Sequence, residues 1–196
     1  MNRASVSTAD AGADVLHSSL RSIANPASAD EFKQAFRNHP AGVAVITADA
    51  GDGPVGLTAT SVFSVSAEPP LLVFSVSALS SSTPTIKRAE TVVVHLLGAD
   101  HIDIAKLCAT SGVDRFADTS AWGRLTTGEP VFHAVHAWIR GAIIAQLEAG
   151  NSTLIVVQAL QVNAPEVGEP AADREATRPL VYHNRAWHHL GEHSRL

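Results

Sequence analysis

The amino-acid sequence predicts a mostly β domain, an antiparallel barrel with helices at its periphery. Two observations carry this prediction. Short apolar runs rich in β-branched residues recur between turn-forming residues, whereas only two or three segments have helical spacing. Few segments follow the strand–helix–strand order of a doubly wound parallel sheet. The 196 residues, 45% of them hydrophobic, suffice for one domain with a sizeable core.

The N-terminal residues are expected to precede the domain as a flexible arm. Residues 1–29 are rich in Ala, Ser and Asp, and no continuous apolar run follows Arg3, so we do not expect a signal peptide. A short helix is expected near residues 15–23 ("VLHSSLRSI"). The folded domain is then expected to span residues 30–196.

The first firm element is a helix that begins after Ser28. Glu31 lies three residues further on, as in a capping box. Phe32 and Phe36 are one helical turn apart and would share a face. Pro40 should end the helix because its ring cannot continue it.

The apolar runs that follow predict strands, separated by turns at residues 49–54 and 150–151. They are residues 42–48 ("GVAVITA"), 55–61, 62–67, 70–77, 91–97, 133–149, 152–164, and a final pair within 178–190. Two helices interrupt this series. One starts at "SSTP", with Thr83 as N-cap and Pro84 at the first helical position. The other, within residues 100–112, is closed by Gly112.

Composition argues against several function classes. The formal net charge is −5 and no basic run is present, which disfavours nucleic-acid binding. No apolar run is long enough to cross a membrane. The single cysteine, Cys108, permits neither an internal disulfide nor a cysteine-only metal cage, and it fits a reducing cytoplasm.

Motifs for metal binding and nucleophilic catalysis are weak. There are ten histidines, but His133 and His136 would point to opposite faces of a strand, and neighbouring His188 and His189 would diverge as well. No G-x-S-x-G motif is present, and Cys108 lies on the apolar side of its helix. No glycine-rich loop follows a strand and opens a helix, so a Rossmann nucleotide site is not indicated. We therefore predict no metal site.

Small hydroxyl side chains gather at the ends of two predicted strands and before the "SSTP" helix. Such groups, together with free N–H groups at a helix start, can bind an anion such as phosphate without a lysine clamp. The alternative is that these residues only form turns and caps. They are Thr58, Thr60, Ser61, Ser75, Ser77, and residues 80–83.

The order of these segments resembles the flavin reductase-like family, in particular the short-chain reductase components of two-component monooxygenases. The resemblance implies an FMN-binding split β-barrel of antiparallel, Greek-key type. It runs from about residue 31 to residue 190 and rests on "FRNHPAGVAVIT", "GLTATSVFSVSAEPPLLVFSV", "SSTPTIKRAETVVVHLL", "VDRFADTSAW", "GEPVFHAVHAWI" and "RPLVYHNRAWHHL". The "GLTATS" and "EPPLL" pieces are its most specific part.

The resemblance implies a flavin site built from three segments and a few later positions. Residues 58–61 would lie along the isoalloxazine ring and ribityl chain, residues 75–77 would flank the ring, and residues 81–83 would hold the phosphate. The later positions fall near the flavin in the family. By name the residues are Thr58, Ala59, Thr60, Ser61, Ser75, Val76, Ser77, Ser81, Ser82, Thr83, Phe116, His183 and Trp187.

The activity that the resemblance implies is hydride transfer from NADH or NADPH to FMN or FAD. Because the cofactors carry the reactivity, the protein needs only to position the rings and exclude side reactions. The resemblance further implies a homodimer that supplies reduced flavin to a separate monooxygenase.

One departure from the family pattern opens an alternative. Many members have Gly-Asp-His in the turn between the two long strands, and that histidine is linked to the nicotinamide side. Here Asn151 and Ser152 follow Gly150 instead. Either His95 or His183 compensates, or the chain is a flavin-binding protein or FMN enzyme that does not use nicotinamide.

Overall fold

The computed structural model describes residues 25–135, 137–164 and 178–196. The expected short helix at residues 15–23 lies outside these residues, as does most of the expected flexible arm. Residues 25–28 lead directly into α2 (Ala29–Arg37). At the start of this helix the Ser28 hydroxyl accepts a hydrogen bond from the Glu31 backbone, and the Glu31 side chain bonds the Ser28 backbone, so the predicted capping box is confirmed.

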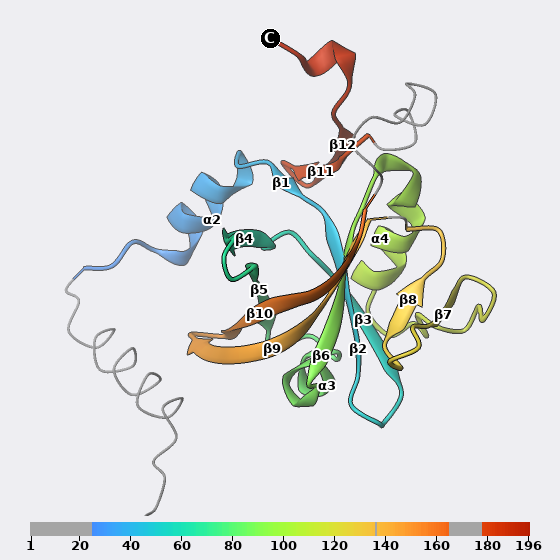
Figure 1. Ribbon diagram of the computed structural model, residues 1–196. Helices are drawn as coiled ribbons and strands as arrows, with labels where there is room; N and C mark the ends of the chain where they lie inside the picture. The colour runs from blue at the N-terminus through green and yellow to red at the C-terminus, as the bar shows by residue number, and fades with distance from the viewer. Residues whose placement is uncertain (1–24, 136, 165–177) are drawn as a thin grey trace, which may run out of the picture.

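A seven-stranded antiparallel sheet dominates the molecule (Figure 1), which confirms the predicted fold class. The strand order is β3-β2-β6-β9-β10-β5-β4. The strands are β2 (Ala44–Asp49), β3 (Pro54–Ala59), β4 (Phe63–Ser66), β5 (Leu71–Ser77), β6 (Thr91–Leu96), β9 (Trp138–Ala149) and β10 (Ser152–Asn163). Consecutive strands β3 and β4 therefore lie at opposite edges, and the chain must cross from one edge to the other between them.

Smaller elements surround this sheet. Strands β1 (Ala41–Gly42), β11 (Leu180–His183) and β12 (Ala186–His189) form a second sheet, and β7 (Trp122–Arg124) pairs with β8 (Pro130–Phe132). The helices after α2 are α3 (Thr83–Arg88) and α4 (Ile102–Ala109). Short 3₁₀ turns lie at Ala99–His101 and Glu192–Ser194. No helix in the described part of the chain is long and apolar enough to cross a membrane.

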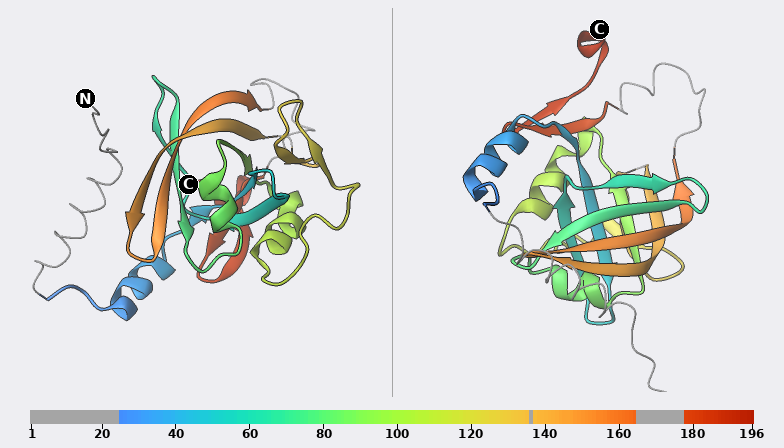
Figure 2. Two further views of the ribbon diagram at one scale, coloured as in Figure 1. Left: turned by 90° about the horizontal axis from the view of Figure 1, so that it is seen from below. Right: turned by 90° about the vertical axis from the view of Figure 1, so that its left-hand side faces the viewer.

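Two buried clusters pack against opposite faces of the central strands. The inner cluster fills the curved sheet and includes Ile46, Phe74 and Ile155, and α3 contributes Ile86 to it. Figure 2 shows α3 lying across one open end of the curved sheet. The outer cluster joins the sheet to α4, β8 and β11 and includes Val45. Since Val45 and Ile46 are adjacent in β2, this strand is buried on both faces, which explains its unbroken apolar run.

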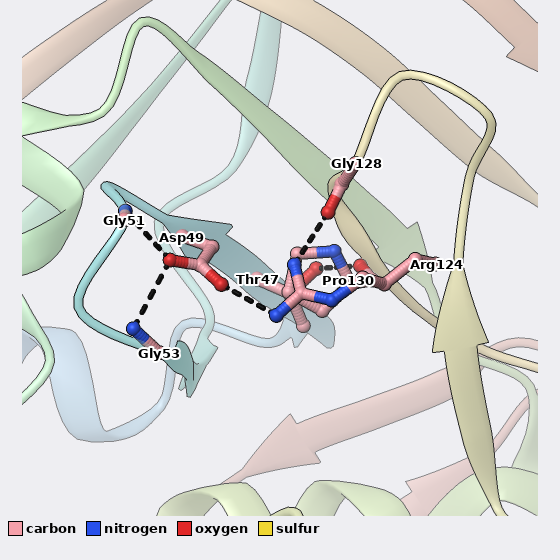
Figure 3. A network of polar contacts seen from close by, with 7 residues as sticks. All are labelled: Thr47, Asp49, Gly51, Gly53, Arg124, Gly128 and Pro130. Atoms are coloured by element: carbon pink, nitrogen blue, oxygen red, sulfur yellow. Dashed lines mark hydrogen bonds and ion pairs between the residues drawn. The ribbon is translucent and has the colours of Figure 1, made fainter.

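The β7–β8 hairpin is held against the turn between β2 and β3 by polar contacts (Figure 3). Arg124 donates to Asp49 at 2.6 Å and to the Gly128 carbonyl, while Thr47 Oγ1 donates to the Pro130 carbonyl at 2.5 Å. Partial burial alone would raise the pKa of Asp49. The hydrogen bonds from Arg124 and from two backbone N–H groups outweigh burial and hold this pKa below its usual value.

Among the element boundaries that differ from the predictions are those of α3, α4 and β9. Ser82, not Thr83, is the N-cap of α3, and it makes no side-chain capping bond. Helix α4 ends at Ala109, before Gly112. The first long strand begins at Trp138 rather than at residue 133, because Phe132 and Val135 form a tight turn ahead of it. The β7–β8 hairpin was not predicted at all.

Candidate functional site

The two edges of the curved sheet meet at Ser61, directly after β3. Its hydroxyl accepts a hydrogen bond from the Ser75 N–H at 3.0 Å and lies 3.3 Å from the Ser75 carbonyl oxygen. The Ser61 side chain thus meets the backbone N–H and C=O groups of Ser75, which a neighbouring strand would otherwise bond. This contact brings residues 58–61 beside residues 75–77, as the family resemblance implies.

The start of α3 is tied to the same two strands. Ser82 Oγ donates to the Gly56 carbonyl of β3 at 2.8 Å, and Thr83 Oγ1 donates to the Ser77 carbonyl of β5 at 2.7 Å. Both residues are buried. Their hydroxyl protons are therefore committed to the fold, whereas the neighbouring Ser81 is exposed. All three segments expected to bind flavin meet at this junction.

Several predicted contact residues turn their side chains into the cores. Ala59 and Val76 belong to the inner cluster, and Thr58 Oγ1 donates to the Ala105 carbonyl of α4 at 2.6 Å. Phe116 lies in the outer cluster, with its ring 5.6 Å from that of Phe132. At residues 58, 59 and 76 a ligand in the junction would therefore meet the backbone or a small part of the side chain, whereas no contact brings the Phe116 ring to Ser61, Ser75 or Thr83. Thr60 and Ser77, in contrast, are exposed.

The altered turn lies next to β5. The Ala78 N–H donates to the Asn151 carbonyl at 2.9 Å, and Ser152 pairs with Ser77 across β5 and β10. Beside it, Lys87 of α3 forms an ion pair of 2.6 Å with Glu148 of β9. The hydrogen bond from Lys87, followed by one from Thr153, holds the pKa of Glu148 below its usual value.

His95, one of the two histidines considered as a compensating group, is fully buried between β2 and β8. Its Nδ1 lies 3.1 Å from the Val45 carbonyl, and its Nε2 accepts from the Phe132 N–H at 3.2 Å. Burial lowers the pKa of His95 to about 4, so the ring is neutral near pH 7. Because both ring nitrogens face backbone groups in the core, His95 cannot replace the histidine that is missing from the turn at residues 150–152.

His183 and Trp187 lie on the β11–β12 hairpin but on different faces of it. Trp187 pairs with Tyr182, with ring centroids 4.8 Å apart, and packs against the outer cluster. His183 faces His188 instead, at 5.7 Å. The structure does not bring either residue against the junction of residues 61, 75 and 83 by any contact. Tyr182, which sequence reasoning missed, lines the groove described next.

A groove of about 790 Å³ opens where the junction meets α2 and the β11–β12 turn. Its walls come from segments far apart in the sequence. The lining residues are Phe32, Lys33, Phe36, Arg37, His39, Pro40, Ala41, Gly42, Thr60, Ser61, Val62, Phe63, Tyr182, Asn184 and Arg185. Only Thr60 and Ser61 of this set were expected at the site. The spacing of Phe32 and Phe36 was the available signal for the rest. It predicted a helix face, but not what that face borders.

The described residues contain no group of three or more His, Cys, Asp or Glu side chains placed to hold a metal ion. Cys108 is buried in the outer cluster, and burial raises the pKa of its thiol to about 12. A thiolate nucleophile at this position is therefore not available near neutral pH.

Comparison with known proteins shows which protein family this chain is similar to. The family model described as "Flavin reductase like domain" matches residues 36–191. An NADH:FMN oxidoreductase of Rhodococcus qingshengii is 45% identical over 79% of this chain and 78% of its own length. The reductase component of a flavin-dependent trigonelline monooxygenase from Acinetobacter baylyi is 30% identical over 64% of this chain and 41% of its own length. A flavin reductase domain protein from Arthrobacter sp. FB24 superposes with a TM-score of 0.73 at 34% identity, covering 83% of this chain and 95% of its own.

Proposed function

The chain belongs to the flavin reductase-like family, and on that premise we propose that it transfers a hydride from NADH to FMN at the junction of residues 58–61, 75–77 and 80–83. The single observation that supports the location is the meeting of these three segments, joined by the Ser61, Ser82 and Thr83 hydroxyls. The Rhodococcus relative supports NADH and FMN over NADPH and FAD.

The residues at the junction fit a flavin. Small side chains at residues 58–61 and 75–77 let a flat ring approach the backbone, whose N–H and C=O groups match the polar edge of an isoalloxazine. The exposed Ser81 hydroxyl can donate to a phosphate, together with backbone N–H groups. Ser82 and Thr83 would act differently from the original expectation, because their protons already bind Gly56 and Ser77. They would shape the phosphate loop rather than grip the phosphate.

The contribution of the protein to the reaction is positioning. When both cofactors are bound, the nicotinamide supplies the hydride at C4 and the flavin accepts it at N5. Ser61 holds the two sheet edges together at the junction where the ring would bind, and Lys87 with Glu148 fixes α3 beside them. No side chain needs to transfer a proton for this step. This agrees with the role of His95, whose Nε2 accepts a hydrogen bond from the Phe132 N–H inside the core.

Thr60→Trp tests the location of the flavin. Thr60 is exposed, so an indole there should leave the free energy of unfolding within about 0.5 kcal/mol of wild type. It should nevertheless raise KM for FMN at least about tenfold, since the ring would occupy space at the junction. The matched control is Thr126→Trp, at an exposed threonine of the β7–β8 turn. Steady-state NADH oxidation at varied FMN measures the effect, and equal KM values for the two variants would refute this location.

The basic activity is tested by NADH oxidation with added FMN. Wild-type protein should accelerate it several hundredfold over the rate without protein. The alternative drawn from the altered turn is a flavin protein that does not use nicotinamide. Tight stoichiometric FMN binding without any such acceleration would establish that alternative and sink the proposed function.

Three finer proposals accompany the reaction. Reduced FMN would pass to a separate monooxygenase, as the name of the Acinetobacter relative suggests.

The chain would act as a homodimer in the cytoplasm, where its thiol stays reduced. Strands β9 and β10 expose Ile144, Leu160 and Val162, and a second copy would cover them. Sedimentation should then give twice the mass of one chain.

A further inference from the structure

The groove beside α2 has an aromatic wall. Phe32, Phe36 and Phe63 are 60%, 58% and 57% exposed, although each is a large apolar residue. The rings of Phe32 and Phe36 lie 4.7 Å apart at the α2 face that borders the groove. Figure 1 shows α2 beside β4 and close to β1. Exposed aromatic faces of this kind can stack on a purine.

The same groove has a basic rim. Lys33, Arg37 and Arg185 line it, and no acidic residue among the described ones does so. This excess of positive charge is particular to the groove, whereas the whole chain carries a formal net charge of −5. Neither guanidinium makes a side-chain hydrogen bond or ion pair with another described residue, and Lys33 has only an exposed contact of 3.6 Å with Asp30. The groove therefore complements an anion.

Arg185 occupies a backbone conformation that does not favour it. Asn184 and Arg185 form the two-residue turn between β11 and β12, and both have positive φ, at 49° and 63°. Glycine is the preferred second residue of such a turn, because a Cβ is disfavoured there. The turn is held against α2 by a bond from the Asn184 N–H to the Arg37 carbonyl at 3.1 Å. A bulky cation in this conformation, in a residue that lines a groove, points to a use of its side chain.

We propose that this groove binds the adenosine diphosphate moiety of the nicotinamide co-substrate. Arg37 and Arg185 contact the two phosphates, and the adenine stacks on the phenylalanine wall. Thr60 and Ser61 line the groove and also belong to the flavin junction, so the nicotinamide end of the same molecule would reach the flavin. The inference rests on the proposed function and specifies where its second substrate binds without a turn histidine.

The test uses Arg185→Gly and Arg37→Ala, with Arg195→Gly as the matched control. Arg195 is an exposed arginine outside the groove lining. Arg185→Gly removes the guanidinium and relieves the backbone, so its free energy of unfolding should equal or exceed that of wild type. Both groove variants should raise KM for NADH about three- to tenfold while kcat and KM for FMN change less than twofold. The control should behave like wild type.

A binding measurement separates this inference from catalysis. ADP, titrated calorimetrically into flavin-free protein, should bind wild type and Arg195→Gly, and its affinity should fall at least about fivefold in both groove variants. Failure of ADP to bind, or equal binding by all proteins, would overturn the proposal even if NADH:FMN turnover is present. A selective rise in KM for FAD would instead assign the groove to the flavin. A change in sedimenting mass without a change in ADP affinity would assign it to a second copy. Either result would also overturn the proposal.

Discussion

Gly141→Ala should lower the free energy of unfolding by about 3 kcal/mol or prevent folding. This is the upper end of the cost usually seen when a core is overpacked. Gly141 lies in the interior of β9, between β6 and β10. A Cβ there would come within 2.3 Å of Val157 Cγ1 and 2.7 Å of the Gln158 carbonyl oxygen. The oxygen belongs to the backbone of the paired strand and cannot move without disturbing the ladder. Urea unfolding of the soluble variant measures the loss.

Gly56→Ala is the control for this effect. Gly56 is likewise a buried strand glycine, but the nearest atoms to an added Cβ are 3.5 Å away, on Cys108 and Phe116. This is an ordinary van der Waals distance, so the free energy of unfolding should change by less than about 1 kcal/mol. If both variants lost the same stability, the cause would be the removal of glycine itself rather than the contact at Gly141.

Acidification from pH 6.5 to pH 4 should cost the fold about 3 kcal/mol through His95 alone. The pKa of this side chain is lowered from 6.5 to about 4 in the folded protein, with burial as the largest cause and His101 as a further one. Well above pH 6.5 both the folded and the unfolded states hold a neutral ring. Between pH 6.5 and 4 the unfolded state binds the proton that the folded state refuses, so stability falls as the pH falls.

His95→Gln isolates this contribution. Glutamine retains one donor and one acceptor for the Val45 carbonyl and the Phe132 N–H, but it does not titrate. We expect the variant to be less stable at pH 7.5 yet to lose less stability than wild type between pH 6.5 and 4.5. Urea unfolding at intervals of one pH unit measures both slopes. Parallel slopes would show that His95 is already protonated or exposed in the folded state.

Strands that are buried on both faces could be predicted because each one is an unbroken apolar run, which can be read from the sequence without knowing its neighbours in the fold. The β2 run around Val45 and Ile46 and the capping box at Ser28 are examples. The β7–β8 hairpin was missed because its strands are three residues each. It is stabilised by Arg124 bonding Asp49 and Thr47 bonding Pro130, which are contacts across the fold and leave no periodic pattern.

The sequence indicated that the hydroxyl-rich segments come together, but not what their side chains do. The resemblance placed the hydroxyl-rich segments together, and the Ser61–Ser75 contact agrees with that placement. The sequence could not show that Ser82 and Thr83 donate inward, because the Gly56 and Ser77 carbonyls that accept from them come from other strands. It also could not show that Arg185, 148 positions after Arg37, shares a groove with it.

Flavin binding at the junction is tested most directly by a crystal structure of the protein grown with FMN. In that structure the isoalloxazine should lie along residues 58–61 and 75–77 and the phosphate beside residues 80–83, with Ser61 still bonded to Ser75. FMN found at another surface, or a junction closed to the ring in protein that a titration shows to be saturated, would contradict it.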